Sequence, residues 1–276
     1  MFTLNCKSKL LIINEPVVMG IINVTDDSFY SKSRLGSEQD ILQTAENMLA
    51  QRAAILDVGG QSSRPGSEPI PEGLEIQKVT KAIESILKRF PETIISVDTY
   101  RSNVAKYAVA SGAAIVNDIS AGMIDNKMIE LVGSLQVPFI CMHMKGTPSN
   151  MKSESHYQDL LSNVMDYFIE RITLCKNSGI KDIIIDPGFG FAKTIEQNLL
   201  LLKNLSIFKI LDCPILAGLS RKSTIYKTLG TSAVEALNGT TVLNTLALQN
   251  GAKILRVHDV KEAQEAITLF QAYERA

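Results

Sequence analysis

The sequence predicts an α/β fold in which parallel strands alternate with helices, and three observations lead to that prediction. The chain has 276 residues, which suits one large α/β domain. Short apolar runs rich in β-branched residues alternate with longer amphipathic stretches, as βα units do. Each short run is almost wholly apolar, which is typical of strands buried on both faces of a parallel sheet. We therefore expect a single (β/α)8, or TIM, barrel domain over residues 1–276.

The apolar runs predict eight strands. In chain order they are Val17–Val24, Ala54–Gly59, Thr93–Thr99, Ala114–Asp118, Pro138–Met144, Asp182–Pro187, Pro214–Ser220 and Ala252–His258. An open doubly wound sheet is the alternative. Such a sheet usually has fewer strands, and no Gly-x-Gly-x-x-Gly sequence follows the first run.

Three of the intervening stretches carry apolar residues at helical spacing. These sets are Ile41, Ala45, Met48 and Leu49; Ile76, Val79, Ile83, Ile86 and Leu87; and Leu160, Val164, Phe168, Ile172 and Cys175. Ser37 with Asp40 resembles a capping box before the first helix. Gly179 is expected to end the last of the three.

Charge and composition exclude several classes of protein. Lys plus Arg is 28 and Asp plus Glu is 29, a formal net charge of −1, so we expect neither a nucleic-acid partner nor a membrane surface. No apolar run approaches the roughly 20 residues of a membrane span, and the first residues lack the apolar core of an export signal. The four cysteines are far apart in the sequence, which indicates reduced thiols in a cytoplasmic protein.

Polar residues interrupt the predicted strands at their carboxyl ends. In chain order they are Asn23, Asp57, Asp98, Asn117 with Asp118, His143, Asp186, Ser220, and Arg256 with His258. In a barrel of this type the active site forms at that end of the strands. Because an unpaired buried carboxylate is costly, a purely structural barrel has no need of such a ring.

The predicted ring of polar residues is mixed in charge. Asp57, Asp98 and Asp186 are acidic, whereas Arg64, Arg221, Lys222, Arg256 and His258 are basic. This mixture indicates a ligand with two unlike ends: N–H donors that meet carboxylates, and an anion, best a phosphate or diphosphate, that meets the cations. The polar loops Thr25–Leu35 and Gln61–Pro71 are candidate lids at the mouth of the barrel.

Eight motifs at these strand ends resemble those of the dihydropteroate synthases. They are Gly20-Ile-Ile-Asn-Val-Thr25 through Ser28-Phe29, Asp57-Val-Gly-Gly-Gln-Ser-Ser-Arg-Pro-Gly66, Ser96-Val-Asp-Thr99, Val116-Asn-Asp-Ile119, Met142-His-Met-Lys-Gly-Thr-Pro148, Asp186-Pro-Gly-Phe-Gly-Phe191, Ser220-Arg-Lys-Ser223 and Arg256-Val-His-Asp259. The resemblance covers nearly the whole chain. It implies a folate-pathway transferase that joins 7,8-dihydropterin-6-ylmethyl diphosphate to 4-aminobenzoate, giving 7,8-dihydropteroate and pyrophosphate. It also implies Mg²⁺, a homodimer and a sulfonamide target.

The resemblance further implies roles for individual residues. Those implied for the pterin diphosphate are Ser63, Asp98, Asn117, Asp186, Lys222, Arg256 and His258. Those implied for 4-aminobenzoate are Phe29, Arg64, Pro65 and Ser220. Asn23 is similar to the family's Mg²⁺ ligand, and Asp27, Asp98, Asp186 and Lys222 are expected to take part in catalysis.

These roles suggest a mechanism. The bond from the pterin methylene to the diphosphate breaks early, the aspartates Asp98 and Asp186 stabilise the cationic pterin, and the arylamine attacks. The arylamine is neutral at pH 7, so no strong base is required.

Several positions depart from the family pattern or have a simpler explanation. Asp26 replaces the family's usual proline, Ser31–Arg34 replaces its Asp-Gly-Gly, and Gln61 and Ser63 replace Glu and Thr. Asp118 and Asp259 are expected to cap helices, Asp57 is as consistent with a brace for the loop backbone as with a ligand contact, and His143 is at least as consistent with the core. Two other functions remain open: a pterin-dependent methyltransferase and a non-catalytic pterin-binding paralogue.

Overall fold

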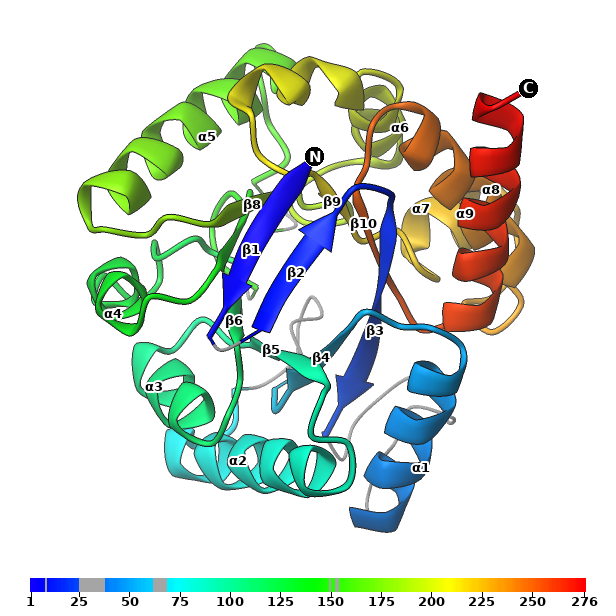
Figure 1. Ribbon diagram of the computed structural model, residues 1–276. Coiled ribbons are helices and arrows are strands. Elements are labelled where there is room, and N and C mark those ends of the chain that lie inside the picture. The colour runs from blue at the N-terminus through cyan, green and yellow to red at the C-terminus, as the bar shows by residue number, and fades with distance from the viewer. Residues whose placement is uncertain (8, 25–37, 62–68, 149, 152–153) are drawn as a thin grey trace.

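The computed structural model describes residues 1–7, 9–24, 38–61, 69–148, 150–151 and 154–276, and a ring of parallel strands lies at its centre (Figure 1). The strands are β3 (Val17–Asn23), β4 (Ile55–Gly59), β5 (Ile94–Asp98), β6 (Ile115–Asp118), β7 (Phe139–Met142), β8 (Ile183–Asp186), β9 (Leu216–Ala217) and β10 (Ile254–Val257). They form one eight-stranded parallel sheet in the order β8-β7-β6-β5-β4-β3-β10-β9. A parallel bridge between Ile185 and Ile215 joins its two ends. The predicted barrel is confirmed.

All eight predicted strands are present, and the largest difference is in β9. It pairs with β10 through only two residues, although the prediction ran from Pro214 to Ser220. Pro214 has no N–H to donate to a ladder, and its carbonyl accepts a hydrogen bond from Ile185 instead. The chain turns after Ala217, because the N–H of Lys222 donates back to the Leu219 carbonyl.

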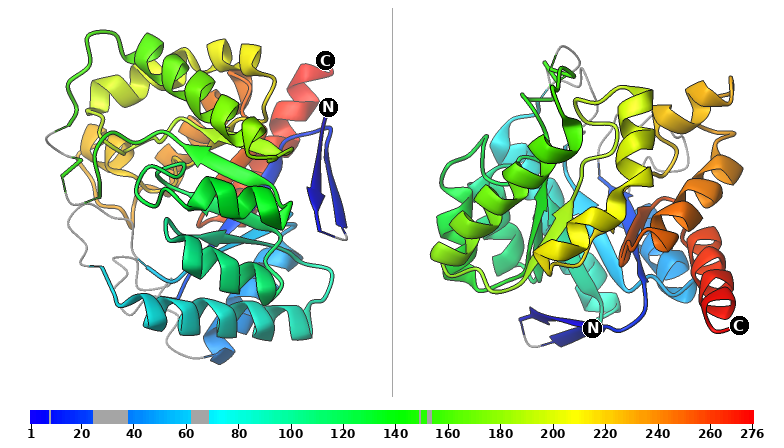
Figure 2. Two further views of the ribbon diagram at one scale, coloured as in Figure 1. Left: turned by 90° about the vertical axis from the view of Figure 1, so that its left-hand side faces the viewer. Right: turned by 90° about the horizontal axis from the view of Figure 1, so that it is seen from above.

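Helices follow the strands and form an outer layer (Figure 2). They are α1 (Glu38–Ala50), α2 (Glu72–Arg89), α3 (Ser102–Ala110), α4 (Met128–Leu135), α5 (Leu160–Asn177), α6 (Ile195–Lys203), the 3-10 helix η2 (Leu205–Leu211), α7 (Ser223–Thr228), α8 (Leu237–Gln249) and α9 (Val260–Glu274). The apolar face predicted for α5 is buried throughout. Gly179 follows its end with a φ of +87°, as expected for a helix stop. Ser37 lies outside the described residues. None of the described helices is both long and apolar enough to span a membrane.

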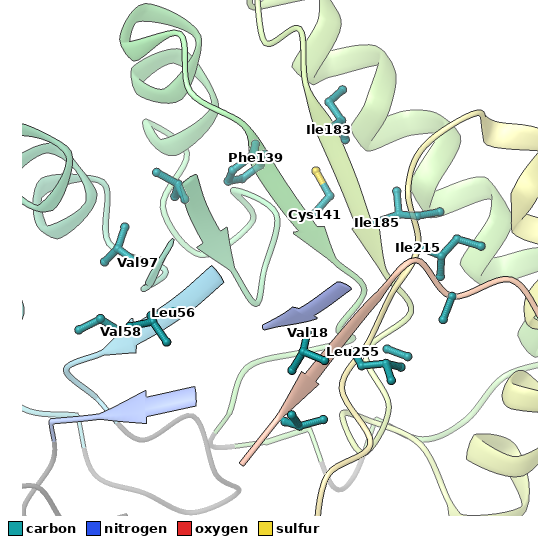
Figure 3. Packing of buried hydrophobic residues seen from close by; sticks show 14 of the residues in the cluster. Val18, Leu56, Val58, Val97, Phe139, Cys141, Ile183, Ile185, Ile215 and Leu255 are labelled. Atoms are coloured by element: carbon teal, nitrogen blue, oxygen red, sulfur yellow. The ribbon is translucent and has the colours of Figure 1, made fainter. Parts of the chain in front are cut away.

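The main core lies between the strands and the helices (Figure 3). Phe168 of α5 is fully buried there and packs edge-on against Phe208, with ring centroids 5.7 Å apart.

We expect Phe168→Ala to lower the free energy of unfolding by about 3–5 kcal/mol, because the cavity adds to the lost burial. Urea unfolding measures this. The matched control is Ile169→Ala on the same helix, where the side chain is 51% exposed and a change below about 1 kcal/mol is expected.

An N-terminal hairpin was not among the predicted elements. Strands β1 (Phe2–Cys6) and β2 (Lys9–Ile13) pair antiparallel and lie across one end of the barrel (Figure 2). Leu4, Cys6 and Ile13 pack against residues at the beginnings of the barrel strands. The hairpin therefore covers the amino ends of the barrel strands. The candidate site lies at the other end, where the strands have their carboxyl ends.

Candidate active site

A buried network of charged and amide groups joins four barrel strands at their carboxyl ends. The guanidinium of Arg256, on β10, donates from Nε to Oδ2 of Asp57 at 2.6 Å and from Nη2 to Oδ2 of Asp98 at 2.5 Å. The amide of Asn117, on β6, donates to the same Asp57 oxygen at 3.0 Å. The structure thus brings the predicted Asp98, Asn117 and Arg256 together. Within the part of the chain that the structure describes, the Asp57 carboxylate contacts the side chains of Asn117 and Arg256.

Asp186 and Lys222 form a second part of the same site. One oxygen of Asp186 accepts the backbone N–H of Gly188 at 2.8 Å. The ammonium of Lys222 donates to the Phe189 carbonyl and lies 4.8 Å from the centre of the Phe191 ring. Burial raises the pKa of Asp186, and Arg256 is among the charges that oppose this shift. Burial lowers the pKa of Lys222, and Asp98 is among the charges that oppose that one, so the two parts are close enough to interact electrostatically.

Two glycines leave room beside these polar groups. A Cβ on Gly59 would lie 3.6 Å from Oδ1 of Asn23 and 3.7 Å from Oδ2 of Asp98. A Cβ on Gly218 would lie 3.6 Å from the Lys222 ammonium and 3.8 Å from Oδ2 of Asp186. Because neither glycine has a side chain, a ligand can approach these four polar groups closely.

Burial shifts the ionisation of these groups toward neutrality. It raises the pKa of Asp98 to about 7, against the opposing effect of Arg256, and it also raises the pKa of Asp186, where Lys222 is the main opposing charge. It lowers the pKa of Lys222 to about 8. Groups of both signs whose pKa values are shifted toward neutral pH at one place are typical of a functional site.

The raised pKa of Asp98 predicts a pH-dependent stability. An unfolded aspartate titrates near ~3.9, so between about pH 4 and 7 the folded protein holds a proton that the unfolded chain has lost. The contribution of Asp98 to the free energy of unfolding is therefore fully present below about pH 4 and is lost as the pH rises through about 7. We expect the difference between the wild type and Asp98→Asn, measured by urea unfolding at several pH values, to fall across this window. A difference independent of pH would contradict the assignment.

His258 and Ser220 form a pair beside these groups. The Ser220 hydroxyl oxygen lies 3.0 Å from Nδ1 of His258 and accepts the backbone N–H of His258 at 3.2 Å. A hydroxyl that accepts this N–H can give its own proton to Nδ1. The direction of this hydrogen bond depends on which ring nitrogen of His258 carries the hydrogen.

Three predictions about charged residues at the strand ends are wrong. Arg221 is not left for an anionic ligand: it forms a buried, two-point ion pair with Asp259 at 2.8 and 2.9 Å and donates to the Ala233 carbonyl. Asp259 directly precedes α9, but its side chain does not cap that helix. Asp118 does not cap a helix either: it accepts the N–H groups of Ser120 and Gly122 and braces the loop after β6.

Other predicted residues lie outside the part of the chain that the structure describes. They are Asp27, Phe29, Ser63, Arg64 and Pro65, and the departures at Asp26 and Ser31–Arg34. His143 is buried, and its Nδ1 lies 2.9 Å from the ammonium of Lys193. Sequence reasoning missed Lys193, because a single lysine after a glycine-rich turn carries no periodic signal.

The fold and these groups define a barrel enzyme with a buried polar site at the carboxyl ends of its strands, and the comparisons agree. A family model described as "Pterin binding enzyme" matches residues 19–258, so the chain belongs to the pterin-binding enzymes. It is 39% identical over 262 residues to the dihydropteroate synthase of Escherichia coli, covering 94% of this chain and 92% of that protein. The chain is therefore a member of the dihydropteroate synthase family.

Solved structures of this family have the same fold. A dihydropteroate synthase of Yersinia pestis in a sulfonamide drug complex superposes with a TM-score of 0.95 at 34% identity and covers 100% of both chains. A dihydropteroate synthase of Xanthomonas albilineans in complex with 7,8-dihydropteroate has a TM-score of 0.89 at 33% identity, again over 100% of both chains.

Proposed function

We infer that this chain is a dihydropteroate synthase, which joins 7,8-dihydropterin-6-ylmethyl diphosphate to 4-aminobenzoate and releases pyrophosphate. The observation that carries this inference is the convergence of Asp98, Asn117, Asp186, Lys222 and Arg256 at one mouth of the barrel. Carboxylates and an amide oxygen suit the N–H groups of a pterin ring, and buried polar groups of this kind reject a ring that lacks those groups.

Asp57 explains how two of these residues are oriented. Because the Asn117 NH₂ donates to Asp57, the amide oxygen of Asn117 is left to accept an N–H from the ring. The same carboxylate oxygen holds Nε of Arg256. With Asp98 on Nη2, the guanidinium is fixed by its edge, and its flat face is proposed to stack on the pterin.

The proposed reaction develops positive charge on the pterin methylene and negative charge on the leaving diphosphate, and the site must stabilise both. As the C–O bond breaks, its electron pair leaves with the diphosphate, and Asp98 and Asp186 stabilise the cationic pterin methylene. The aminobenzoate nitrogen forms the new C–N bond and releases a proton. Lys222 is proposed at the ring's carbonyl side, and Ser63 and His258 are proposed as donors to the diphosphate.

The second substrate is proposed to bind beside the Ser220 and His258 pair. Phe29 of the loop at 25–35 and Arg64 and Pro65 of the loop at 61–71 are proposed to cover it, and Asp27 belongs to the first of these loops. Ser220 is proposed near its carboxylate. Sulfonamides are proposed to occupy the same place.

Mg²⁺ is proposed as the cofactor, with Asn23 as its ligand from the chain. A single neutral side-chain oxygen fits this ion, which keeps several waters and takes further oxygens from a phosphate. The Asn23 oxygen lies beside the space left by Gly59. When bound, the ion would neutralise charge on the diphosphate.

Asn23→Ala is expected to raise the Mg²⁺ concentration needed for half-maximal activity about 10-fold or more, while the KM for 4-aminobenzoate stays within about twofold of wild type. Steady-state kinetics at a series of Mg²⁺ concentrations measures this. An unchanged Mg²⁺ dependence would assign the ion to other groups.

The proposed reaction is tested by pyrophosphate release. Release should require both the pterin diphosphate and 4-aminobenzoate, and 7,8-dihydropteroate should appear in equal amount. Pterin binding without release would favour the non-catalytic paralogue. Methyl transfer from a methylated pterin to a corrinoid would favour the methyltransferase, which needs no group that binds a diphosphate.

A homodimer is also proposed. Large apolar side chains are exposed on α8 and α9, including Val242 at 51%, Leu269 at 72% and Tyr273 at 71%. Such a patch favours burial against a second copy. A cytoplasmic location is proposed as well, and the four cysteines, which are all free and buried, are consistent with it.

A further inference from the structure

The turn between β8 and α6, residues 187–194, supports two of the proposed site residues. The N–H of Gly188 donates to Asp186 at 2.8 Å, and the Phe189 carbonyl accepts from Lys222. Neither contact holds the turn in place by itself. The orientation of Asp186 and of the Lys222 ammonium therefore depends on the other contacts that hold this turn in position.

Two side chains hold this turn from outside it or at its end: Asn198, whose Oδ1 accepts the Gly190 N–H at 2.7 Å, and Lys193, which binds the carbonyls next to Asp186 and Lys222. The Lys193 ammonium donates to the Gly188 carbonyl and to the Phe191 carbonyl, both at 3.1 Å, and lies 2.9 Å from Nδ1 of His143. An ammonium has three N–H groups, and these three acceptors match them. The Gly188 residue is thus held on both sides, by Lys193 at its carbonyl and by Asp186 at its N–H.

His143 provides the fixed end of this arrangement. Burial, followed by the charge of Lys193, holds the pKa of His143 well below its usual value, so the ring is neutral and Nδ1 can accept. The ring packs edge-on against Tyr167 at 4.8 Å, and the Tyr167 hydroxyl donates to the Met142 carbonyl at 2.9 Å. A Cβ on Gly188, whose φ is +70°, would lie 2.0 Å from the His143 carbonyl oxygen. The turn therefore has no space to shift toward β7.

We propose that Lys193 is a positioning residue for pterin binding, which acts by holding the Gly188 and Phe191 carbonyls so that Asp186 and Lys222 face the ring. The proposal rests on the proposed function. The charges support it: burial lowers the pKa of Lys193 to about 7, and the Asp186 carboxylate opposes this shift. The charge of Lys193 is therefore coupled to the carboxylate that it positions.

The test is a double-mutant cycle between Lys193→Met and Asp186→Asn, read out as the Kd of a 6-hydroxymethyl-7,8-dihydropterin probe by calorimetry at pH 6.5. Methionine keeps the length of the side chain and removes all three donors. We expect Lys193→Met alone to weaken binding about 10-fold or more, and to weaken it less than about threefold when Asp186 is already Asn, because residues that act through each other are not additive. Equal effects in both backgrounds, or no effect, would overturn the proposal.

Lys145→Met is the matched control. Lys145 is exposed on the neighbouring loop after β7, and its ammonium donates to the His156 carbonyl, so its loss should leave the pterin Kd within about twofold. If Lys193→Met does not fold, Lys193→Gln keeps one donor group and carries the same cycle. Failure of both to fold would overturn the proposal, since it would show that Lys193 supports the whole barrel. A wild-type protein that binds no pterin would instead contradict the proposed function.

Discussion

Asp186→Asn is expected to lower kcat/KM for the pterin diphosphate by about 10²–10³ with little loss of stability. The change keeps the size of the side chain and an oxygen that can accept the Gly188 N–H. It removes the negative charge that the mechanism places beside the cationic pterin methylene, and one preorganised electrostatic contact is worth about 2.7–4 kcal/mol in a transition state. Steady-state pyrophosphate release measures the effect.

Asp182→Asn is the matched control for this prediction. Asp182 immediately precedes the same strand, but its carboxylate accepts the backbone N–H of Asn5 at 2.7 Å, so it lies at the hairpin end of the barrel. Its substitution should leave kcat/KM within about twofold, because its carboxylate is bound at the end of the barrel opposite the active mouth. An Asp186→Asn variant that turned over like the wild type would remove Asp186 from the mechanism, whatever its position.

The barrel strands could be predicted because each is buried on both faces. A run such as Ile183–Asp186 is wholly apolar until its last residue, and few other environments produce that pattern. The hairpin could not be predicted in the same way. Strand β1 alternates exposed and buried residues over only five positions, and its partner contains Lys9 and the exposed Leu10. These two strands are stabilised by packing against the end of the barrel, and this tertiary contact leaves no pattern in the local sequence.

The sequence predicts where in the fold the candidate site lies better than it predicts which side chains contact one another there. Parallel strands bring their carboxyl ends to one rim, so Asp98, Asn117 and Arg256 were expected together. The sequence does not say which side chain meets which. Arg256 reaches Asp98 across two intervening strands. Arg221 turns toward Asp259 from a backbone φ of +53°, a conformation that arginine seldom adopts and that no sequence pattern indicates.

Arg256→Met should lower the free energy of unfolding by about 3–5 kcal/mol at pH 8. The variant keeps most of the side-chain volume but leaves two carboxylates without their cation. The side chain of Asp57 is 0% exposed and that of Asp98 is 10% exposed. Breaking a buried pair from one side costs this much because an uncompensated charge remains in the core. Urea unfolding measures the loss, and pterin binding should fall with it.

A second ion pair in the same chain separates this effect from a general loss of arginine. Arg275 and Glu15 are also 2.6 Å apart, but their side chains are 70% and 56% exposed, so Arg275→Met should cost less than about 1 kcal/mol. The pH dependence gives a further check. Without Arg256, the main influence that lowers the pKa of Asp98 is gone, so Asp98 takes up a proton more readily and the deficit should shrink as the pH falls from 8 toward 5. A deficit that is constant over this range would mean that lost packing, rather than the buried charges, accounts for the loss.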